Sequence, residues 1–320
     1  MKNVVLTLLI FLCAAPALAL ELALPVACTV GGDCWVQQYV DHDAGAGSTD
    51  YACGVASYDG HDGTDIRVLH TGVDVAVLAA AAGRVKAVRD GVVDRLVKSP
   101  ADLAAVAKFQ CGNGVVIIHE DGWETQYCHL RKGSVSVKTG DVIGAGDQLG
   151  LIGFSGEAAF PHVHVTVRKD GKVVDPFSAD DTTDCKATDR SLWSASAQNA
   201  LAYKGSELLQ LAWAPQIYDD AEVESGNLFA FQPNQWPALV LFAEAINLYK
   251  DDVMTLTVSL PGQKPVVNSI VMKNNRAVQR LYAGKKIKGS LSHGIYVGRF
   301  ELKRGDVVVL ANEIKFEMKD

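Results

Sequence analysis

The sequence predicts a mainly β protein with two domains, an antiparallel β-sandwich or barrel-like domain followed by a smaller C-terminal β-sandwich domain. Between Thr64 and Pro176, short β-prone runs are broken by glycine, without a regular alternation of strands and helices. From about residue 216, apolar and polar residues alternate, as in residues 254–262, 294–302 and 313–318. Such alternation is typical of strands with one buried face.

Residues 1–19 have the layout of a secretory signal peptide. Lys2 is followed by an apolar stretch, and the segment ends in Ala17-Leu18-Ala19, which suits cleavage after about Ala19. A membrane anchor is the alternative, but the apolar run is too short to span a bilayer comfortably. We expect an exported chain, periplasmic or secreted, with no transmembrane segment after cleavage.

The remaining chain is long enough for two domains. We expect an N-terminal segment with disulfides (20–54), the first β domain (55–185), a linker (186–215) that contains a helix near 196–210, and the C-terminal β-sandwich domain (216–320). The net charge is −7 and no basic patch stands out. Nucleic acid or an anionic membrane surface is therefore not expected as the main partner.

Six cysteines remain after the signal peptide, and an even number in an exported chain suggests disulfides. Residues 111–130 predict a hairpin with Cys111 and Cys128 near its open end, close enough to bridge. Cys28 and Cys34 would close a small loop, which leaves Cys53 and Cys185 as the third pair by elimination. Six cysteines allow 15 connectivities, so only the hairpin pair has a local argument. A cysteine metal site is not expected, because no C-x-x-C pair is present.

Seven of the eight histidines fall between positions 42 and 164, and this clustering indicates chemistry. His162 and His164 are two residues apart in a β-branched run, so their side chains share one face of the predicted strand. His61 and Asp65 are spaced i, i+4 in H-D-G-T-D, and in an extended segment these positions also face one side. One histidine of the 162/164 pair, added to His61 and Asp65, gives two imidazoles and one carboxylate. This set is typical of a catalytic zinc site with an open position for water. These ligand types favour zinc over iron or manganese.

A second segment has the same spacing. His70 and Asp74 occur in H-T-G-V-D, but Asp74 leads directly into an apolar run that predicts a buried strand. His61 and Asp65 follow a turn and precede a short strand, which favours them as the ligands.

The order of motifs resembles that of the lysostaphin-type, or LytM-type, zinc peptidases. The motifs are H-x-G-T-D from His61, V-x-A-A-A-A-G-x-V from Val77, Y-x-H-L from Tyr127, G-x-S-G from Gly153, and P-H-x-H from Pro161. The resemblance covers about residues 55–176. It implies a peptidase that cuts peptide bonds of bacterial peptidoglycan, in stem cross-links or bridges. It also implies that His61, Asp65 and His164 bind one zinc ion, and that His129 and His162 act on the substrate and the water.

Two other classes of function are compatible with parts of the sequence. One is a catalytically inactive peptidase-fold module that binds cell-wall peptides or regulates another hydrolase, but such a protein typically lacks a ligand or a catalytic histidine. The other is a carrier domain, because the glycine turns of residues 138–150 resemble those of lipoyl-bearing sandwiches. A carrier function does not explain the histidine cluster. The bond that is cut and the role of the C-terminal domain stay open at this point.

Overall fold

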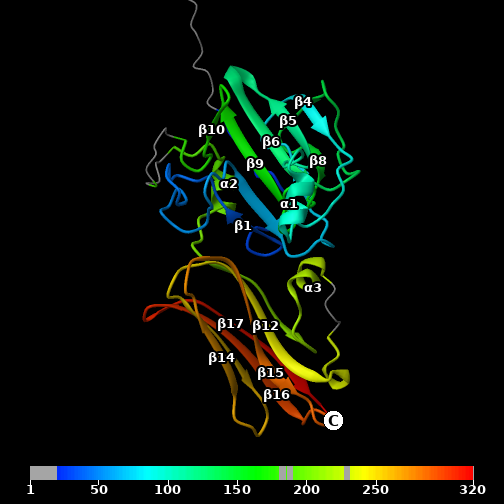
Figure 1. The fold of residues 1–320 in the computed structure, drawn as a ribbon, viewed down its shortest axis with the longest axis vertical. Helices are drawn as coiled ribbons and strands as arrows, with labels where there is room; N and C mark the ends of the chain where they lie inside the picture. The colour runs from blue at the N-terminus through cyan, green and yellow to red at the C-terminus, as the bar shows by residue number, and fades with distance from the viewer. Residues whose placement is uncertain (1–19, 180–184, 186–189, 227–230, 320) are drawn as a thin grey trace, which may run out of the picture.

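The computed structural model describes residues 20–179, 185, 190–226 and 231–319. The predicted signal peptide (1–19) lies outside the described residues. The chain forms two β-rich domains that lie end to end (Figure 1), which confirms the predicted mainly β fold class. Within the described ranges, no helix has the length and apolar character needed to cross a membrane.

The N-terminal domain is built on one antiparallel eight-stranded sheet in the order β1-β2-β9-β6-β5-β4-β7, with β10 also paired to β9. Its strands are β1 (Cys34–Gln38), β2 (Thr64–Val68), β4 (Gly83–Arg89), β5 (Asn113–Ile118), β6 (Trp123–Leu130), β7 (Val142–Ile143), β9 (His162–Lys169) and β10 (Lys172–Val174). A separate pair joins β3 (Ala76–Leu78) to β8 (Gln148–Leu151), and two short helices are α1 (Pro100–Val106) and α2 (Ala195–Ala200).

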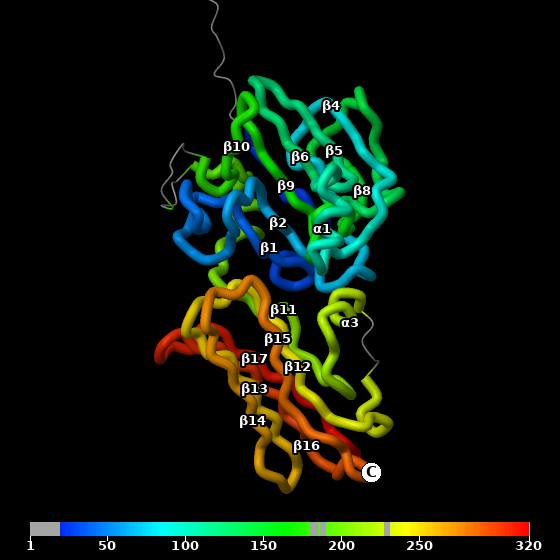
Figure 2. The backbone as a smooth tube through the Cα atoms, viewed as in Figure 1, coloured from blue at the N-terminus to red at the C-terminus, as the bar shows by residue number. Residues whose placement is uncertain are grey.

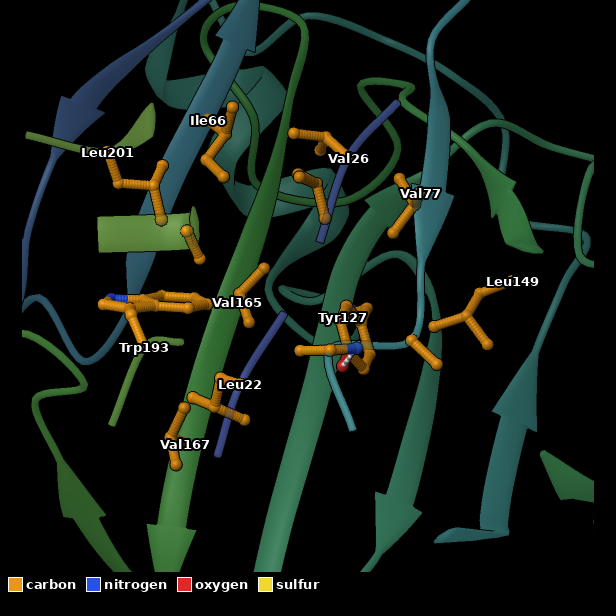
Figure 3. Packing of buried hydrophobic residues seen from close by; sticks show 14 of the residues in the cluster. Leu22, Val26, Ile66, Val77, Tyr127, Leu149, Val165, Val167, Trp193 and Leu201 are labelled. Atoms are coloured by element: carbon orange, nitrogen blue, oxygen red, sulfur yellow. Dashed lines mark hydrogen bonds between the residues drawn. The ribbon is translucent and has the colours of Figure 1, made fainter. Parts of the chain in front are cut away.

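Strand β9 has one face toward the hydrophobic core. Its residues Val163, Val165 and Val167 are at most 1% exposed, and Val165 and Val167 point toward Leu22 and Trp193 (Figure 3). Because side chains alternate along a strand, residues 162, 164 and 166 point to the opposite face. Core packing on one face therefore fixes the direction of both strand histidines.

The structure forms three disulfides, Cys28–Cys34, Cys53–Cys185 and Cys111–Cys128. The last one joins β6 to the segment just before β5, at the open end of the predicted hairpin. The turn of that hairpin is a 3-10 segment, η1 (Glu120–Gly122).

The C-terminal domain is a sandwich of a three-stranded sheet, β11-β12-β15, and a four-stranded sheet, β14-β13-β16-β17. These strands are β11 (Glu207–Ala214), β12 (Ala238–Leu248), β13 (Val253–Ser259), β14 (Val266–Val271), β15 (Arg276–Lys286), β16 (Gly294–Arg304) and β17 (Val307–Met318). A helix, α3 (Asp220–Ser225), and a 3-10 segment, η2 (Pro233–Gln235), connect β11 to β12. The domain thus begins with β11, inside the expected linker, and the helix expected near 196–210 is limited to α2.

Buried contacts join the two domains. Trp35 of β1 packs with Leu209 of β11 and Ile246 of β12. The side-chain amide of Asn247 donates to the carbonyl of Gln37 at 2.9 Å. Helix α3 lies at the junction (Figure 2), where Glu224 faces the buried guanidinium of Arg67 on β2 at 3.5 Å. The domains therefore share a packed interface.

Candidate active site

Strand pairing brings the predicted metal ligands together. In the antiparallel register of β2 and β9, Asp65 lies opposite His164, and Arg67 lies opposite His162. His61 is in the loop just before β2. All three side chains of the predicted ligand set, His61, Asp65 and His164, are buried at one place.

The three donor atoms form a compact triangle. Nε2 of His61 is 3.2 Å from Oδ1 of Asp65 and 3.2 Å from Nδ1 of His164, and Nδ1 of His164 is 2.8 Å from Oδ1 of Asp65. Ligands held at about 2.0–2.1 Å from a tetrahedral zinc ion are about 3.3 Å from one another. The residues present therefore fit a zinc ion with three protein ligands.

The second nitrogen of each ring is also engaged, which orients the first. Nδ1 of His61 lies 2.6 Å from the carbonyl of Tyr39, so this nitrogen donates and Nε2 keeps its lone pair. Nε2 of His164 lies 3.1 Å from Oδ1 of Asp62 and 3.0 Å from Oγ1 of Thr166, which leaves Nδ1 for the shared site. Such outer contacts are typical of metal-binding histidines.

The local electrostatics favour positive charge between these residues. Burial opposes the ionisation of Asp65, but the charges and hydrogen bonds of His61, His162 and His164 hold the pKa of Asp65 well below its ordinary value. Burial likewise opposes protonation of His164, yet hydrogen bonds with Asp62 and Asp65 raise its pKa to about 9. A carboxylate held in its ionised form between imidazoles, as Asp65 is, suits a metal cation.

His129 and His162 lie beside this triangle without being part of it. Their ring centroids are 4.6 Å apart, and Nε2 of His162 is 3.6 Å from Oδ1 of Asp65. Nδ1 of His129 donates to the carbonyl of Ser155, and Nδ1 of His162 donates to the carbonyl of Phe160, each at 2.8 Å. Both rings therefore keep an unprotonated Nε2 that can accept a proton.

Burial keeps these two imidazoles neutral. Burial, together with the nearby His162 and His164, lowers the pKa of His129 well below its usual range. Burial also lowers the pKa of His162, although the charge of Asp65 opposes this change. Neutral imidazoles next to a metal site can take a proton from water and return it to a leaving group.

His70 and Asp74 lie away from the donor triangle. Asp74 pairs with Arg131, with its side chain 71% exposed, and the ring of His70 lies against Gly72 and Gly226. The structure thus brings His61 into the triangle and leaves His70 at the domain junction.

Several residues of the site had no clear signal in the sequence. Gly63 has no room for a side chain, because a Cβ there would lie 2.5 Å from Nε2 of His164. His129 has a φ of +62°, so it departs from the regular strand, and Tyr127, two residues earlier, points instead into the core. Asp62 is held by Arg168 at 3.3 Å. These features depend on contacts between distant segments, although the glycine of H-x-G-x-D is a signal for close approach.

The histidines open into a cavity of about 470 Å³ that both domains line. The N-terminal domain lines it with Val97, Phe160 and the rings of His129 and His162. The C-terminal domain lines it with Glu224 of α3 and residues of β15. The sequence did not predict that the second domain reaches the histidines.

Comparison with known proteins points to one family. Residues 68–176 match the model of Peptidase family M23, a match that begins just after Asp65 and includes His129, His162 and His164. The DD-carboxypeptidase/endopeptidase Mpg of Neisseria meningitidis is 35% identical over 133 residues, 41% of this chain and 28% of that protein. The peptidoglycan DD-endopeptidase ShyB of Vibrio cholerae is 32% identical over 120 residues, 38% of this chain and 25% of that protein. The chain spans about a quarter of the length of these relatives.

Two solved structures of peptidase catalytic domains are also similar. The catalytic domain of the prophage-encoded M23 protein EnpA from Enterococcus faecalis is 26% identical, with a TM-score of 0.30 over 43% of this chain and 88% of that domain. The catalytic domain of lysostaphin from Staphylococcus simulans is 23% identical, with a TM-score of 0.27 over 41% and 86%. Because both TM-scores are low, the assignment rests on the sequence matches. By those matches, the N-terminal domain of this chain is a lysostaphin-type (LytM-type) domain and belongs to peptidase family M23.

Proposed function

We propose that this chain is an exported zinc-dependent endopeptidase that hydrolyses peptide bonds in bacterial peptidoglycan. The observation that carries the proposal is the donor triangle of His61, Asp65 and His164, with the unprotonated Nε2 atoms of His129 and His162 beside it. An inactive binding module is not favoured, because every ligand and both additional histidines are present.

The residues divide into holding and reacting groups. His61, Asp65 and His164 would hold one zinc ion, which supplies a water of lowered pKa and polarises the scissile carbonyl. Either His129 or His162 would accept the single proton lost by this water at its Nε2. The resulting Nε2–H would donate a hydrogen bond to the developing oxyanion and then give the proton to the departing amine. The helix motif H-E-x-x-H with its glutamate base is absent from the sequence, so histidines have this role.

Export is supported by the signal-peptide pattern and by three disulfides, which form in oxidising compartments. Peptidoglycan as substrate is supported by the name of the relative ShyB, a peptidoglycan DD-endopeptidase, and endopeptidase chemistry by the names of both ShyB and Mpg. The acidic chain and its disulfides suit a periplasmic enzyme better than one bound to an anionic cell-wall polymer.

Digestion of purified peptidoglycan tests the proposal. The zinc-loaded full chain without its signal peptide should release soluble fragments, and their masses should identify a cleaved peptide bond. The matched control is the same chain with His164→Ala. If both proteins leave the sacculi intact, or if the fragments show cleavage only in the glycan, the proposed function is wrong.

A further inference from the structure

Strand β15 of the C-terminal domain is an edge strand that reaches the catalytic cavity. Among the described residues, β15 pairs with β12 on one side and has no strand paired on the other. Ala277, Val278 and Arg280 of β15 line the same cavity as His129, His162 and His164. Ala277 and Val278 are consecutive, so their side chains point to opposite faces. Because the cavity touches side chains on both faces of β15, it reaches the edge of the strand that lies between these faces.

The hydrogen bonds of β15 show which backbone groups point outward. The carbonyl of Tyr282 accepts from the side chain of Asn268 at 2.7 Å, and the carbonyl of Arg280 accepts from the side chain of Gln279 at 2.6 Å. Both carbonyls therefore lie on the edge away from β12. In an antiparallel strand the N–H and C=O of one residue point to the same side and alternate along the chain. The N–H and C=O of Val278 thus also point outward, at the cavity.

The edge is held in a fixed position. Val278 packs against the interdomain cluster of Trp35, Leu209 and Ile246. Arg280 is anchored to Glu224 and Glu244 at 2.6 Å each. Residues Trp35, Ile246 and Glu244 are at most 5% exposed. The C-terminal domain therefore presents this edge as a preformed wall of the cleft.

We propose that β15 binds the substrate by strand addition: an extended peptide segment on one side of the scissile bond pairs with the outward backbone groups of Val278. Main-chain pairing of this kind gives affinity without a charged recognition group. This inference rests on the proposed function, and it assigns the C-terminal domain a part of the substrate site. The class of ligand is an extended peptide, from either a stem cross-link or a glycine bridge.

Residue-resolved amide hydrogen exchange tests the proposal directly. The protein is the zinc-loaded full chain with His129→Ala, which should slow turnover on the order of 10²-fold or more. Two probes are added separately, a purified cross-linked stem-peptide dimer and pentaglycine. Exchange at the Val278 amide should slow with one of them, whereas the Gln279 amide, already directed to β12, should not change. The probe that protects Val278 identifies the source of the peptide.

A substitution provides the second measurement. Val278→Pro removes the outward N–H without removing a bond to β12, as proline on edge strands allows. It should raise the dissociation constant of the effective probe on the order of tenfold, with unchanged zinc content. Val278→Thr keeps both the shape and the N–H, and should bind as the parent does. If Val278→Pro does not fold, the exchange measurement decides alone.

Two results would overturn the inference. Protection near Phe160 without protection at Val278 would leave the proposed peptidase function standing and remove β15 from the substrate site. A complete lack of protection by either probe would count against both the inference and the proposed substrate.

Discussion

Nε2 of His164 lies 3.1 Å from Oδ1 of Asp62. Asp62, which directly follows the candidate ligand His61, therefore orients the ring of the candidate ligand His164. Asp62 is itself placed by Arg168. Because such outer partners fix the tautomer and basicity of a ligand, we expect Asp62→Ala to weaken zinc binding by about 10- to 100-fold. Asp62→Asn, which keeps an acceptor, should be less affected. Competition with a chromophoric chelator measures the affinity, and Asp59→Ala in the same loop is the control. Equal affinities for all three variants would remove Asp62 from the site.

The choice of His61 over His70 gives a second prediction. His61→Ala should lose stoichiometric zinc, because Nε2 of His61 belongs to the donor triangle. His70→Ala should keep it, because His70 lies at the domain junction. Elemental analysis of both purified variants checks this, with circular dichroism to show that each is folded. Zinc loss in His70→Ala with retention in His61→Ala would reverse the assignment.

The ion pairs of Arg280 predict the stability of the C-terminal domain. Arg280→Met leaves Glu244, which is fully buried, without its cation, and should lower the free energy of unfolding on the order of 3 kcal/mol. Arg299→Met removes a pair whose arginine side chain is 62% exposed, and should change it by less than about 1 kcal/mol. Urea titrations of both variants and the parent chain give the comparison. Similar losses in the two variants would show that burial of the Arg280 network contributes little.

The depressed pKa of His129 predicts a dependence of stability on pH. In the unfolded chain this imidazole gains a proton near pH 6.5, whereas in the folded chain it stays neutral until a lower pH. The contribution of neutral His129 to the stability of the fold is therefore fully present above pH 6.5. It is lost as the pH falls toward the pKa of His129 in the folded chain. Below pH 6.5, the free energy of unfolding of the parent should therefore decrease relative to that of His129→Gln, by up to about 1.4 kcal/mol per pH unit. A difference that is constant from pH 7.5 to 5 would contradict a buried neutral imidazole.

The fold class and much of the site could be predicted from local patterns. The spacing of His162 and His164 and the i, i+4 pair of His61 and Asp65 indicate shared faces without any knowledge of the fold. The hairpin that carries His129 was also visible, together with Cys111 and Cys128 near its open end.

Features that depend on packing between distant segments could not be predicted. The direction of His129 depends on a backbone with positive φ, and the contact of Asp62 with His164 joins residues about a hundred positions apart. Strand β11 was not predicted, because its segment has a composition typical of a helix. It forms a strand because pairing with β12 overrides the local propensity. The position of β15 at the cavity follows only from the way the two domains pack.

The separation of metal binding from chemistry is the central claim. His129 and His162 each direct Nδ1 to a carbonyl and keep Nε2 free, whereas His164 contributes Nδ1 to the donor triangle. The most direct test measures zinc content beside hydrolysis of purified peptidoglycan in His129→Ala, His162→Ala and His164→Ala. The first two should keep near-parental zinc and lose on the order of 10²-fold or more in rate, and His164→Ala should lose both. Full hydrolysis by His162→Ala, or zinc loss in His162→Ala with retention in His164→Ala, would contradict the account.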